Sequence, residues 1–263
     1  MDEKDISAAT ELSADYTYED SNTPGRLHGS LAHRLAVDIL RGVYQPGDIL
    51  PFQLDSSEAL NISRTPYREA LKILAAKGFV ESRPKRGTQV CDRTRWNLLD
   101  PEVMGWMFET TPTAGFIDGL FELRLINEPA AAELAAERRT DQEVARMKEA
   151  LDVMGRETLA TETGRLADLD FHKTLLLATR NEVLVSLNSS IAAAIAWSTR
   201  LKSTDPKDAR DSWPDHARVY EAIEARNPRA ARWAMECLVR FALEDTRRSQ
   251  RRRSQPDEAT PSQ

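Results

Sequence analysis

Residues 62–78 read ISRTPYREALKILAAKG, and this stretch decides the fold of the first part of the chain. Ser63 is a good N-cap, and Pro66 follows in the first helical turn, where a missing N–H costs little. Gly78 supplies the C-terminal stop. The stretch therefore predicts a short helix with one apolar face. That face consists of Ala70, Leu71, Leu74 and Ala75.

The opposite face of this helix carries a row of cations. Arg64, Arg68 and Lys72 stand four residues apart in the sequence, so they share one side of a helix. A helix fits the major groove of B-DNA, and arginine is well suited to the O6/N7 edge of guanine. A row of cations is often only a solvated face, so its interpretation as a DNA-reading surface depends on the neighbouring segments.

These neighbours predict the rest of a winged helix-turn-helix. Upstream, leucine or isoleucine recurs every fourth residue over 27–39, which predicts a first helix, and residues 51–60 predict a short second one. Downstream, residues 79–83 and 88–91 predict two short strands joined by the basic turn at 84–87. Three helices followed by a basic hairpin is the order of elements in a winged helix.

The net charge of −6 is distributed unevenly along the chain. Residues 1–25 hold seven Asp or Glu and one Lys, whereas residues 26–95 hold twelve Lys or Arg and seven acidic residues. A basic segment beside acidic ones indicates that residues 26–95 face phosphate groups. Taken alone, the same imbalance also fits chance clustering of surface charge.

The remainder of the chain predicts helices alone, packed as an antiparallel bundle. The fold class is therefore mainly α, with an N-terminal winged helix-turn-helix plus a C-terminal antiparallel all-α helical bundle. Trp197 and Trp233 are expected in the core of the bundle. The expected helices lie near 100–109, 114–138, 141–159, 163–179, 181–202, 212–225 and 228–248.

Four regions follow from these patterns. We expect a disordered acidic arm at 1–25, a DNA-binding domain at 26–95, a helical effector-binding and dimerisation domain at 96–248, and a disordered tail at 249–263. The two cysteines have no metal-type spacing, and the chain shows neither a signal peptide nor an apolar run of membrane-spanning length. We therefore expect a cytoplasmic protein with no membrane partner.

Three polar residues of the helical part form a candidate metal site. Asp168 and His172 are four residues apart and point to one spot if the segment is helical. His216 begins a later helix. A carboxylate with two imidazoles suits a divalent transition metal such as zinc. From spacing alone, surface or hydrogen-bonded residues are the more common explanation.

The first part of the chain resembles the winged helix of the GntR family, over about residues 27–92. The resemblance implies that the cationic helix and the hairpin tip contact an operator. FQL at 52–54 stands where family members usually carry a Ser-Glu-Arg run, so one DNA contact is expected to be lost or replaced. The motifs are YQPGDILP at 44–51, ISRTPYREAL at 62–71, GFV at 78–80 and the pair Arg86-Gly87.

The expected DNA-binding residues come from the helix and the hairpin tip together. The helix supplies the groove-reading side chains, and the hairpin supplies cations for phosphates or the minor groove. The set is Ser63, Arg64, Thr65, Arg68, Lys72, Lys85, Arg86 and Gly87.

The helical part resembles the FCD domain in the FadR-type branch of this family, over roughly residues 100–245. The resemblance implies a metal held by an Asp and three His, and the first three fall on Asp168, His172 and His216. The fourth position falls on Leu238, with Cys237 one residue away. Water or the effector would therefore complete the coordination of the metal. The motifs are FELR at 121–124, NEPA at 127–130, DLDFH at 168–172 and ATRN at 178–181.

Three further residues are candidates for binding an acidic effector. Arg124 matches the position where this branch places an effector-binding arginine, and an arginine fork pairs well with a carboxylate; an ion pair with Glu128 is the alternative. Asn181 and Ser212 are the others, although either could simply cap a helix. The connector RWNLLDPEVMGW at 95–106 is similar to that of galactonate-responsive repressors, which implies a sugar acid such as an aldonate or uronate.

We therefore predict a transcription regulator, with repression the expected direction, and not an enzyme. Its partners would be double-stranded operator DNA, a small organic acid and a second copy of the chain in a homodimer. The main alternative is a metal-dependent hydrolase built on Asp168, His172 and His216. A winged helix used for protein contacts is a third possibility, and it predicts DNA affinity that does not respond to salt.

Overall fold

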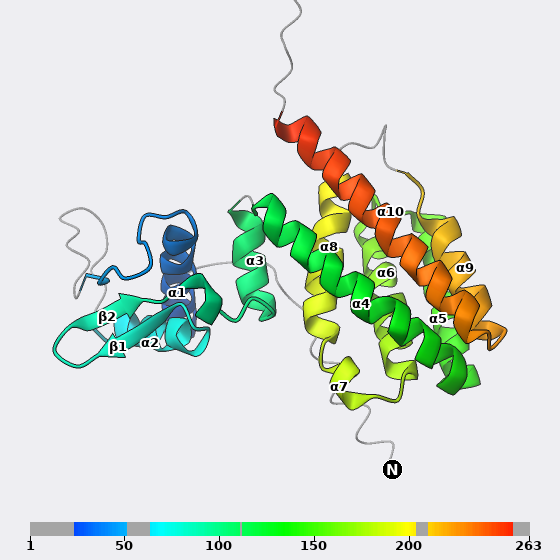
Figure 1. Ribbon diagram of the computed structural model, residues 1–263, viewed down its shortest axis with the longest axis horizontal. Coiled ribbons are helices and arrows are strands. Elements are labelled where there is room, and N and C mark those ends of the chain that lie inside the picture. The colour runs from blue at the N-terminus through cyan, green and yellow to red at the C-terminus, as the bar shows by residue number, and fades with distance from the viewer. Residues whose placement is uncertain (1–23, 52–63, 111, 204–209, 255–263) are drawn as a thin grey trace, which may run out of the picture. The chain divides into compact units, whose positions relative to one another are not determined.

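The computed structural model describes residues 24–51, 64–110, 112–203 and 210–254 (Figure 1). The chain divides into two compact units between Trp96 and Asn97, and each unit is described by itself. Most of the expected helix at 51–60, and Ser63 with it, lie outside the described residues.

The N-terminal unit has the fold of a winged helix. Helix α1 (Pro24–Leu40) packs against α2 (Arg64–Ala76), and a hairpin of β1 (Val80–Arg83) and β2 (Gly87–Val90) follows, then the short 3-10 helix η3 (Arg93–Arg95). The two strands pair antiparallel, and an isolated bridge from Ile49 to Gln89 adds a third segment to the wing. The core residues include Leu31, Leu35, Ile39, Leu74 and Phe79.

The buried face of α2 differs in part from the expected one. Ala70 and Leu74 are fully buried, but Leu71 is only half-buried and Ala75 is exposed. Tyr67 takes their place in the core, and the buried positions 67, 70 and 74 share one helical face. Its hydroxyl donates a hydrogen bond to the Pro51 carbonyl oxygen at 2.5 Å, which satisfies the polar tip of the buried ring.

Gly78 ends α2 in a conformation that only glycine adopts easily. Its φ is +80°, and a Cβ at this position would lie 2.1 Å from the backbone oxygen of Arg95. The next residue, Phe79, stacks on Trp96 with ring centroids 4.5 Å apart. The close approach of residues 78 and 95 therefore ties the end of α2 to the segment after the wing.

We expect Gly78→Ala to destabilise the N-terminal unit by at least about 3 kcal/mol, because backbone strain and a backbone clash add together. Gly42→Ala is the matched control, since Gly42 has a φ of +79° but open space around it, and should cost only about 1–2 kcal/mol. Native-state hydrogen exchange of the α1 and α2 amides measures both. Equal losses at the two positions would show that the contact with Arg95 contributes nothing.

The described part of the C-terminal unit consists of helices (Figure 1). Helix α10 packs along α4, α5 packs on α6, and α9 contacts α10, α5 and α4. The helices are α3 (Pro101–Glu109), α4 (Ala114–Arg138), α5 (Asp141–Glu157), α6 (Glu162–Ala178), α7 (Glu182–Val185), α8 (Asn188–Ser203), α9 (Trp213–Glu224) and α10 (Pro228–Ser254).

Two helix boundaries differ from expectation. The segment 181–202 is not one helix but two, α7 and α8, separated by Ser186 and Leu187. Helix α10 continues to Ser254, so it extends into the stretch expected to be a disordered tail. None of the described helices combines the length and apolar character needed to cross a bilayer.

Polar caps begin most of the bundle helices, and aromatic and methionine side chains fill the space between them. Thr140 and Glu143 form a capping box at the start of α5, which satisfies two otherwise unpaired backbone donors. Trp197 is half-buried and stacks on Phe108. Trp233 is not in the core, because 65% of it is exposed on α10. The largest fully buried side chains of this unit include Phe121, Phe171, Met147, Ile223 and Met235.

Candidate functional site

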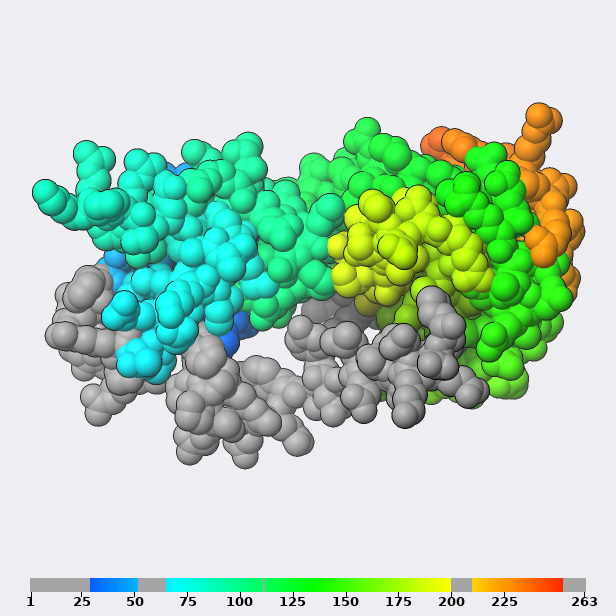
Figure 2. Space-filling model, turned by 90° about the horizontal axis from the view of Figure 1, so that it is seen from below, coloured from blue at the N-terminus to red at the C-terminus, as the bar shows by residue number. Residues whose placement is uncertain are grey.

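The outer face of α2 carries the expected cations and is open to solvent. Thr65, Arg68 and Lys72 are exposed, and α2, in cyan, forms part of the surface of the N-terminal unit in Figure 2. Lys72 is held by Glu69 at 2.8 Å, an exposed pair of the kind that contributes little to stability. Arg64 begins the helix, and its side chain lies outside the described part.

The tip of the wing presents a second group of cations. Lys85 and Arg86 lie in the three-residue loop between the paired residues Arg83 and Gly87, and all four are exposed. Lys85 has a φ of 63° and Gly87 a φ of 91°, which closes the hairpin tightly. No ion pair within the described residues involves Lys85 or Arg86, so both charges are available to phosphates.

Two other arginines near the wing are already engaged. Arg95 and Arg83 each contact the carboxylate of Glu81 at 2.5 Å. Hydrogen bonds from Arg95 and then Arg83 hold the pKa of Glu81 below its usual value. This carboxylate therefore holds both guanidinium groups, whereas Lys85 and Arg86 at the tip carry no such pairing within the described residues.

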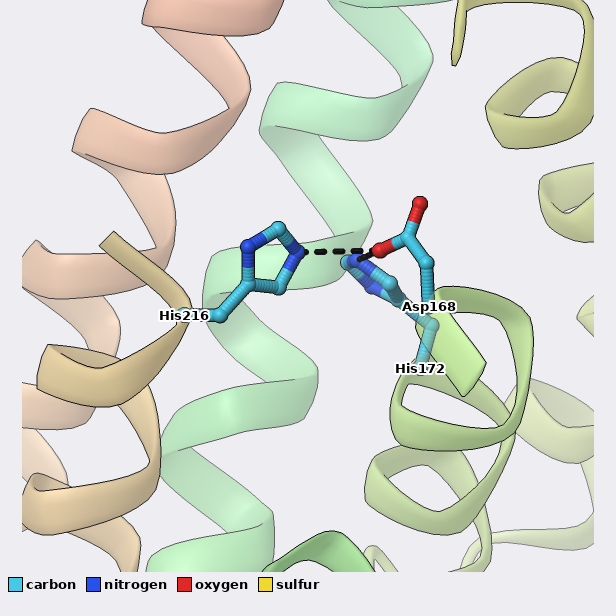
Figure 3. A group of neighbouring side chains, drawn as sticks. All are labelled: Asp168, His172 and His216. Atoms are coloured by element: carbon cyan, nitrogen blue, oxygen red, sulfur yellow. Dashed lines mark ion pairs between the residues drawn. The ribbon is translucent and has the colours of Figure 1, made fainter. Parts of the chain in front are cut away.

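Inside the C-terminal unit, the three candidate metal ligands gather at one buried point (Figure 3). Asp168 and His172 come from α6 and His216 from α9, and all three are at most 4% exposed. Asp168 Oδ1 lies 3.0 Å from His216 Nε2 and 3.6 Å from His172 Nε2. One ligand atom from each residue lies within 4.8 Å of the others.

The short contact between His216 and Asp168 lacks the geometry of a hydrogen bond, and His216 Nε2 is buried without a hydrogen-bond partner. Thr199 Oγ1, on α8, donates to the other carboxylate oxygen of Asp168 at 3.4 Å, so Oδ1 is the oxygen that faces the imidazoles. A buried imidazole nitrogen directed at a carboxylate oxygen without a hydrogen bond fits a bound cation between them.

Arg124 lies beside this cluster and is paired with Glu128. Arg124 Nε donates to Glu128 Oε1 at 2.5 Å, and both side chains are 3% exposed. Burial by itself raises the pKa of Glu128, but the charge of Arg124 and the contact with His172 outweigh burial and lower the pKa to about 2. The ion pair that was the alternative explanation of Arg124 is thus present in the structure.

The other two candidate effector residues differ in their availability. The side chain of Asn181 accepts hydrogen bonds from the backbone N–H groups of Val183 and Leu184 at 3.0 and 3.3 Å, so it caps α7. Ser212 occupies the N-cap position of α9 but makes no capping bond. Its hydroxyl is buried and has no hydrogen-bond partner, and of the three candidates it has the polar atom that a ligand can still engage.

The fourth ligand position offers no donor. Leu238 is a core residue of α10 and is 4% exposed. Its neighbour Cys237 is half-buried and does not belong to the group of converging ligand atoms. Within the described residues, the cluster therefore has two nitrogen donors and one oxygen donor.

Glu128 is the residue of this site whose place sequence reasoning missed. It was considered only as a partner of Arg124, but its second oxygen, Oε2, lies 3.4 Å from His172 Nδ1. The spacing of Arg124 and Glu128 on one helix was a visible signal for their pairing. Nothing in the sequence indicated that α4 brings this carboxylate against α6.

The winged helix with its exposed cationic helix and wing tip defines a DNA-binding transcription regulator. The family description "Bacterial regulatory proteins, gntR family" matches residues 27–90, and the description "FCD domain" matches residues 119–241. The chain belongs to the GntR family, with an FCD domain as its second part. The resemblance noted in the sequence is confirmed.

Curated relatives of the chain are named as transcription regulators. The chain is 31% identical to the galactonate operon transcriptional repressor of Escherichia coli K12, over 78% of this chain and 90% of the relative. It is 30% identical to the Exu regulon transcriptional regulator of the same strain, over 81% of each. Because the family and these relatives are transcription regulators, the prediction that the chain is not an enzyme is confirmed.

A solved structure supports the fold. The structure of Lar, which controls the expression of the Listeria monocytogenes agr system, aligns over 88% of this chain and 99% of its own with a TM-score of 0.58. The sequence identity is 18%, so this likeness concerns the fold alone.

Proposed function

We propose that this regulator is a repressor whose operator binding is relieved by a small carboxylate effector, a sugar acid, which binds at a metal centre inside the FCD domain. The observation that carries this proposal is the buried convergence of Asp168, His172 and His216, with Asp168 Oδ1 at 3.0 and 3.6 Å from the two imidazole nitrogens. An apolar bundle core has no structural need for three such groups at one point.

The donor set fits zinc. Around a tetrahedral zinc ion with bonds of 2.0–2.2 Å, ligand atoms lie roughly 3.4 Å apart, close to the 3.0 and 3.6 Å that separate Asp168 Oδ1 from the two imidazole nitrogens. Three protein ligands leave one position open, which is the arrangement of zinc sites that bind an exogenous group. Asp168, His172 and His216 would hold the ion, and a carboxylate of the effector would take the open position.

The class of effector follows from two lines of support. The relatives named for the galactonate operon and the Exu regulon are similar to this chain over most of its length. The buried hydroxyl of Ser212 has no hydrogen-bond partner, and it precedes the metal ligand His216 by four residues. An effector that carries both a carboxylate and hydroxyl groups would bind the metal through its carboxylate and form a hydrogen bond with the Ser212 hydroxyl. Arg124 and Asn181 remain candidates only if an effector displaces their present partners, Glu128 and the start of α7.

The DNA side of the proposal rests on α2 and the wing. A homodimer would place two copies of α2 in successive major grooves, about one helical turn apart on a palindromic operator in the cytoplasm. Thr65, Arg68 and Lys72 would face base edges and nearby phosphates, together with Ser63 and Arg64, which precede them in the sequence. Effector binding would lower operator affinity, and operator binding would lower effector affinity by the same factor.

Zinc is expected to stabilise the metal-free protein. At a free zinc concentration one thousand times the Kd, the gain is about 4 kcal/mol, measured as a rise in the melting temperature of the FCD domain. His172→Ala should abolish the gain, and His33→Ala, which removes an imidazole from α1 in the other unit, should leave it intact. A wild-type protein indifferent to zinc, nickel and manganese would overturn the metal centre.

The hydrolase alternative is not supported, because the family and the relatives are regulators.

A further inference from the structure

Each imidazole of the cluster has a second polar neighbour on the side away from Asp168. His216 Nδ1 lies 2.8 Å from the backbone oxygen of Ser212. His172 Nδ1 lies 3.4 Å from Glu128 Oε2. Both neighbours are oxygen atoms, and they approach the two rings from different parts of the bundle.

We propose that Glu128 is a positioning residue that fixes the tautomer of His172, and that Arg124 acts by holding Glu128 in place. The Ser212 carbonyl fixes the tautomer of His216 in the same way. The inference rests on the metal centre proposed above. It gives Arg124 a role in building the metal site in place of a direct bond to the effector.

The neighbour of His172 Nδ1 is a carboxylate oxygen of Glu128. Glu128 accepts hydrogen bonds and cannot donate one while it is ionised, and Arg124 Nε at 2.5 Å keeps it paired as a carboxylate. The proton of neutral His172 is therefore favoured on Nδ1, facing Oε2. Nε2 then carries the lone pair and faces Asp168 Oδ1 at 3.6 Å, as a metal ligand requires.

The neighbour of His216 Nδ1 is a main-chain oxygen. A backbone carbonyl only accepts hydrogen bonds, so the 2.8 Å contact with Ser212 places the proton of His216 on Nδ1. Its Nε2 is then the unprotonated nitrogen, in agreement with the absence of a hydrogen bond across the 3.0 Å contact to Asp168. The two histidines thus present the same nitrogen to the same point.

The two acceptors, Glu128 and the Ser212 carbonyl, differ in whether a substitution can remove them. The Ser212 carbonyl belongs to the turn that starts α9, and no side-chain substitution deletes it. Glu128 reaches His172 from α4, a different helix, and is held there by Arg124 on its own helix. The tautomer of His172 therefore depends on a side-chain pair that mutation can change, whereas that of His216 does not.

The first test is nitrogen-15 NMR of the imidazoles in metal-free full-length protein. In the wild type, both His172 and His216 should show Nε2 unprotonated and Nδ1 protonated. In Glu128→Gln, His172 should become a mixture of tautomers while His216 stays unchanged. A wild-type His172 protonated on Nε2, or a His172 unchanged in Glu128→Gln, would overturn the inference.

The second test is zinc affinity, measured by competition with a chelator. Loss of an outer partner of a ligating histidine typically costs roughly 10- to 100-fold in metal affinity, and we expect that loss in Glu128→Gln. Glu128→Asp keeps a charge for buried Arg124 and withdraws the carboxylate from His172, so it should show the same direction if Glu128→Gln folds poorly. Affinity within twofold of the wild type in both variants would contradict the role of Glu128.

Arg124 is tested separately from the effector. Arg124→Lys should weaken zinc binding in the absence of any organic acid, which a residue that only clamps the effector would not do. The metal centre and the positioning role of Glu128 can fail separately. A wild-type protein that binds no zinc would rule out the metal centre. The NMR result in metal-free protein decides the role of Glu128 by itself.

Discussion

Replacing Arg68 with alanine is expected to weaken operator binding by roughly 10- to 100-fold, because a bidentate contact between arginine and guanine contributes about 1–3 kcal/mol of discrimination. Arg68 is exposed on the outer face of α2, whereas the inner face buries Tyr67 and Leu74. The substitution therefore removes a side chain that we propose reads the DNA, and it leaves the packing of the helix in place. The affinity is measured by fluorescence anisotropy with a DNA site selected from a random pool by the full-length protein.

Lys72 provides the matched comparison on the same face of the helix. Lys72→Ala should weaken binding to all sequences alike and reduce the slope of log affinity against log salt by about 1, because lysine contacts phosphate as a point charge. Arg232→Ala, an exposed cation on α10 paired with Glu133, should change neither quantity. Wild-type affinity in Arg68→Ala, or DNA binding that ignores salt, would favour a winged helix used for protein contacts.

Replacing Leu238 with histidine is expected to tighten zinc binding by roughly 100-fold. The resemblance to metal-binding relatives places the fourth ligand at this position, and Leu238 is a buried residue of similar size. If the roughly 10–16 kcal/mol of a four-ligand zinc site is shared evenly, one added ligand contributes about 3 kcal/mol. Because the new ligand fills the open position, the same variant should bind a carboxylate effector more weakly than the wild type.

Leu238→Met is the control for this experiment, since it conserves volume in the core and adds no good zinc ligand. Zinc affinity is measured by chelator competition, and effector affinity by calorimetry on the zinc-loaded protein. If Leu238→His and Leu238→Met bind zinc equally, then position 238 does not face the cluster, and the assignment of the open coordination position is wrong.

The winged helix was predictable because its signals are local. The expected N-cap residue, the proline, the apolar spacing and the glycine stop all lie within seventeen residues of the sequence, and the hairpin segment follows directly. Which of Tyr67 and Ala75 lies on the buried face of α2 is not determined by residues within the helix. It depends on the Pro51 carbonyl that accepts the tyrosine hydrogen bond, sixteen residues away in the sequence.

The break between α7 and α8 was missed because the apolar pattern continues through Ser186 and Leu187. No glycine or proline marks it, and only the Asn181 cap signals the start of a very short helix. Trp233 was expected in the core from its size and apolar character. Its exposure depends on which face α10 turns toward α4 and α9, and a helix that is apolar on more than one side does not determine this.

The metal cluster was predictable in part. The spacing of Asp168 and His172 on one helix is a local signal, but their meeting with His216 requires the packing of α6 and α9. The contact of Glu128 with His172 carries no local signal at all. It meets His172 only because α4 crosses α6, and no spacing in the sequence contains that contact.

The measurement that tests the whole account most directly is release of the operator by sugar acids. Full-length protein, loaded with zinc and bound to its selected DNA site, is titrated with aldonates and uronates, galactonate included, and the anisotropy of the DNA is followed. We expect at least one of them to release the DNA from the wild type, and the same acid to have no effect on His172→Ala or after chelation. Release that is equally strong without the metal, or a complex that no sugar acid disturbs, would contradict it.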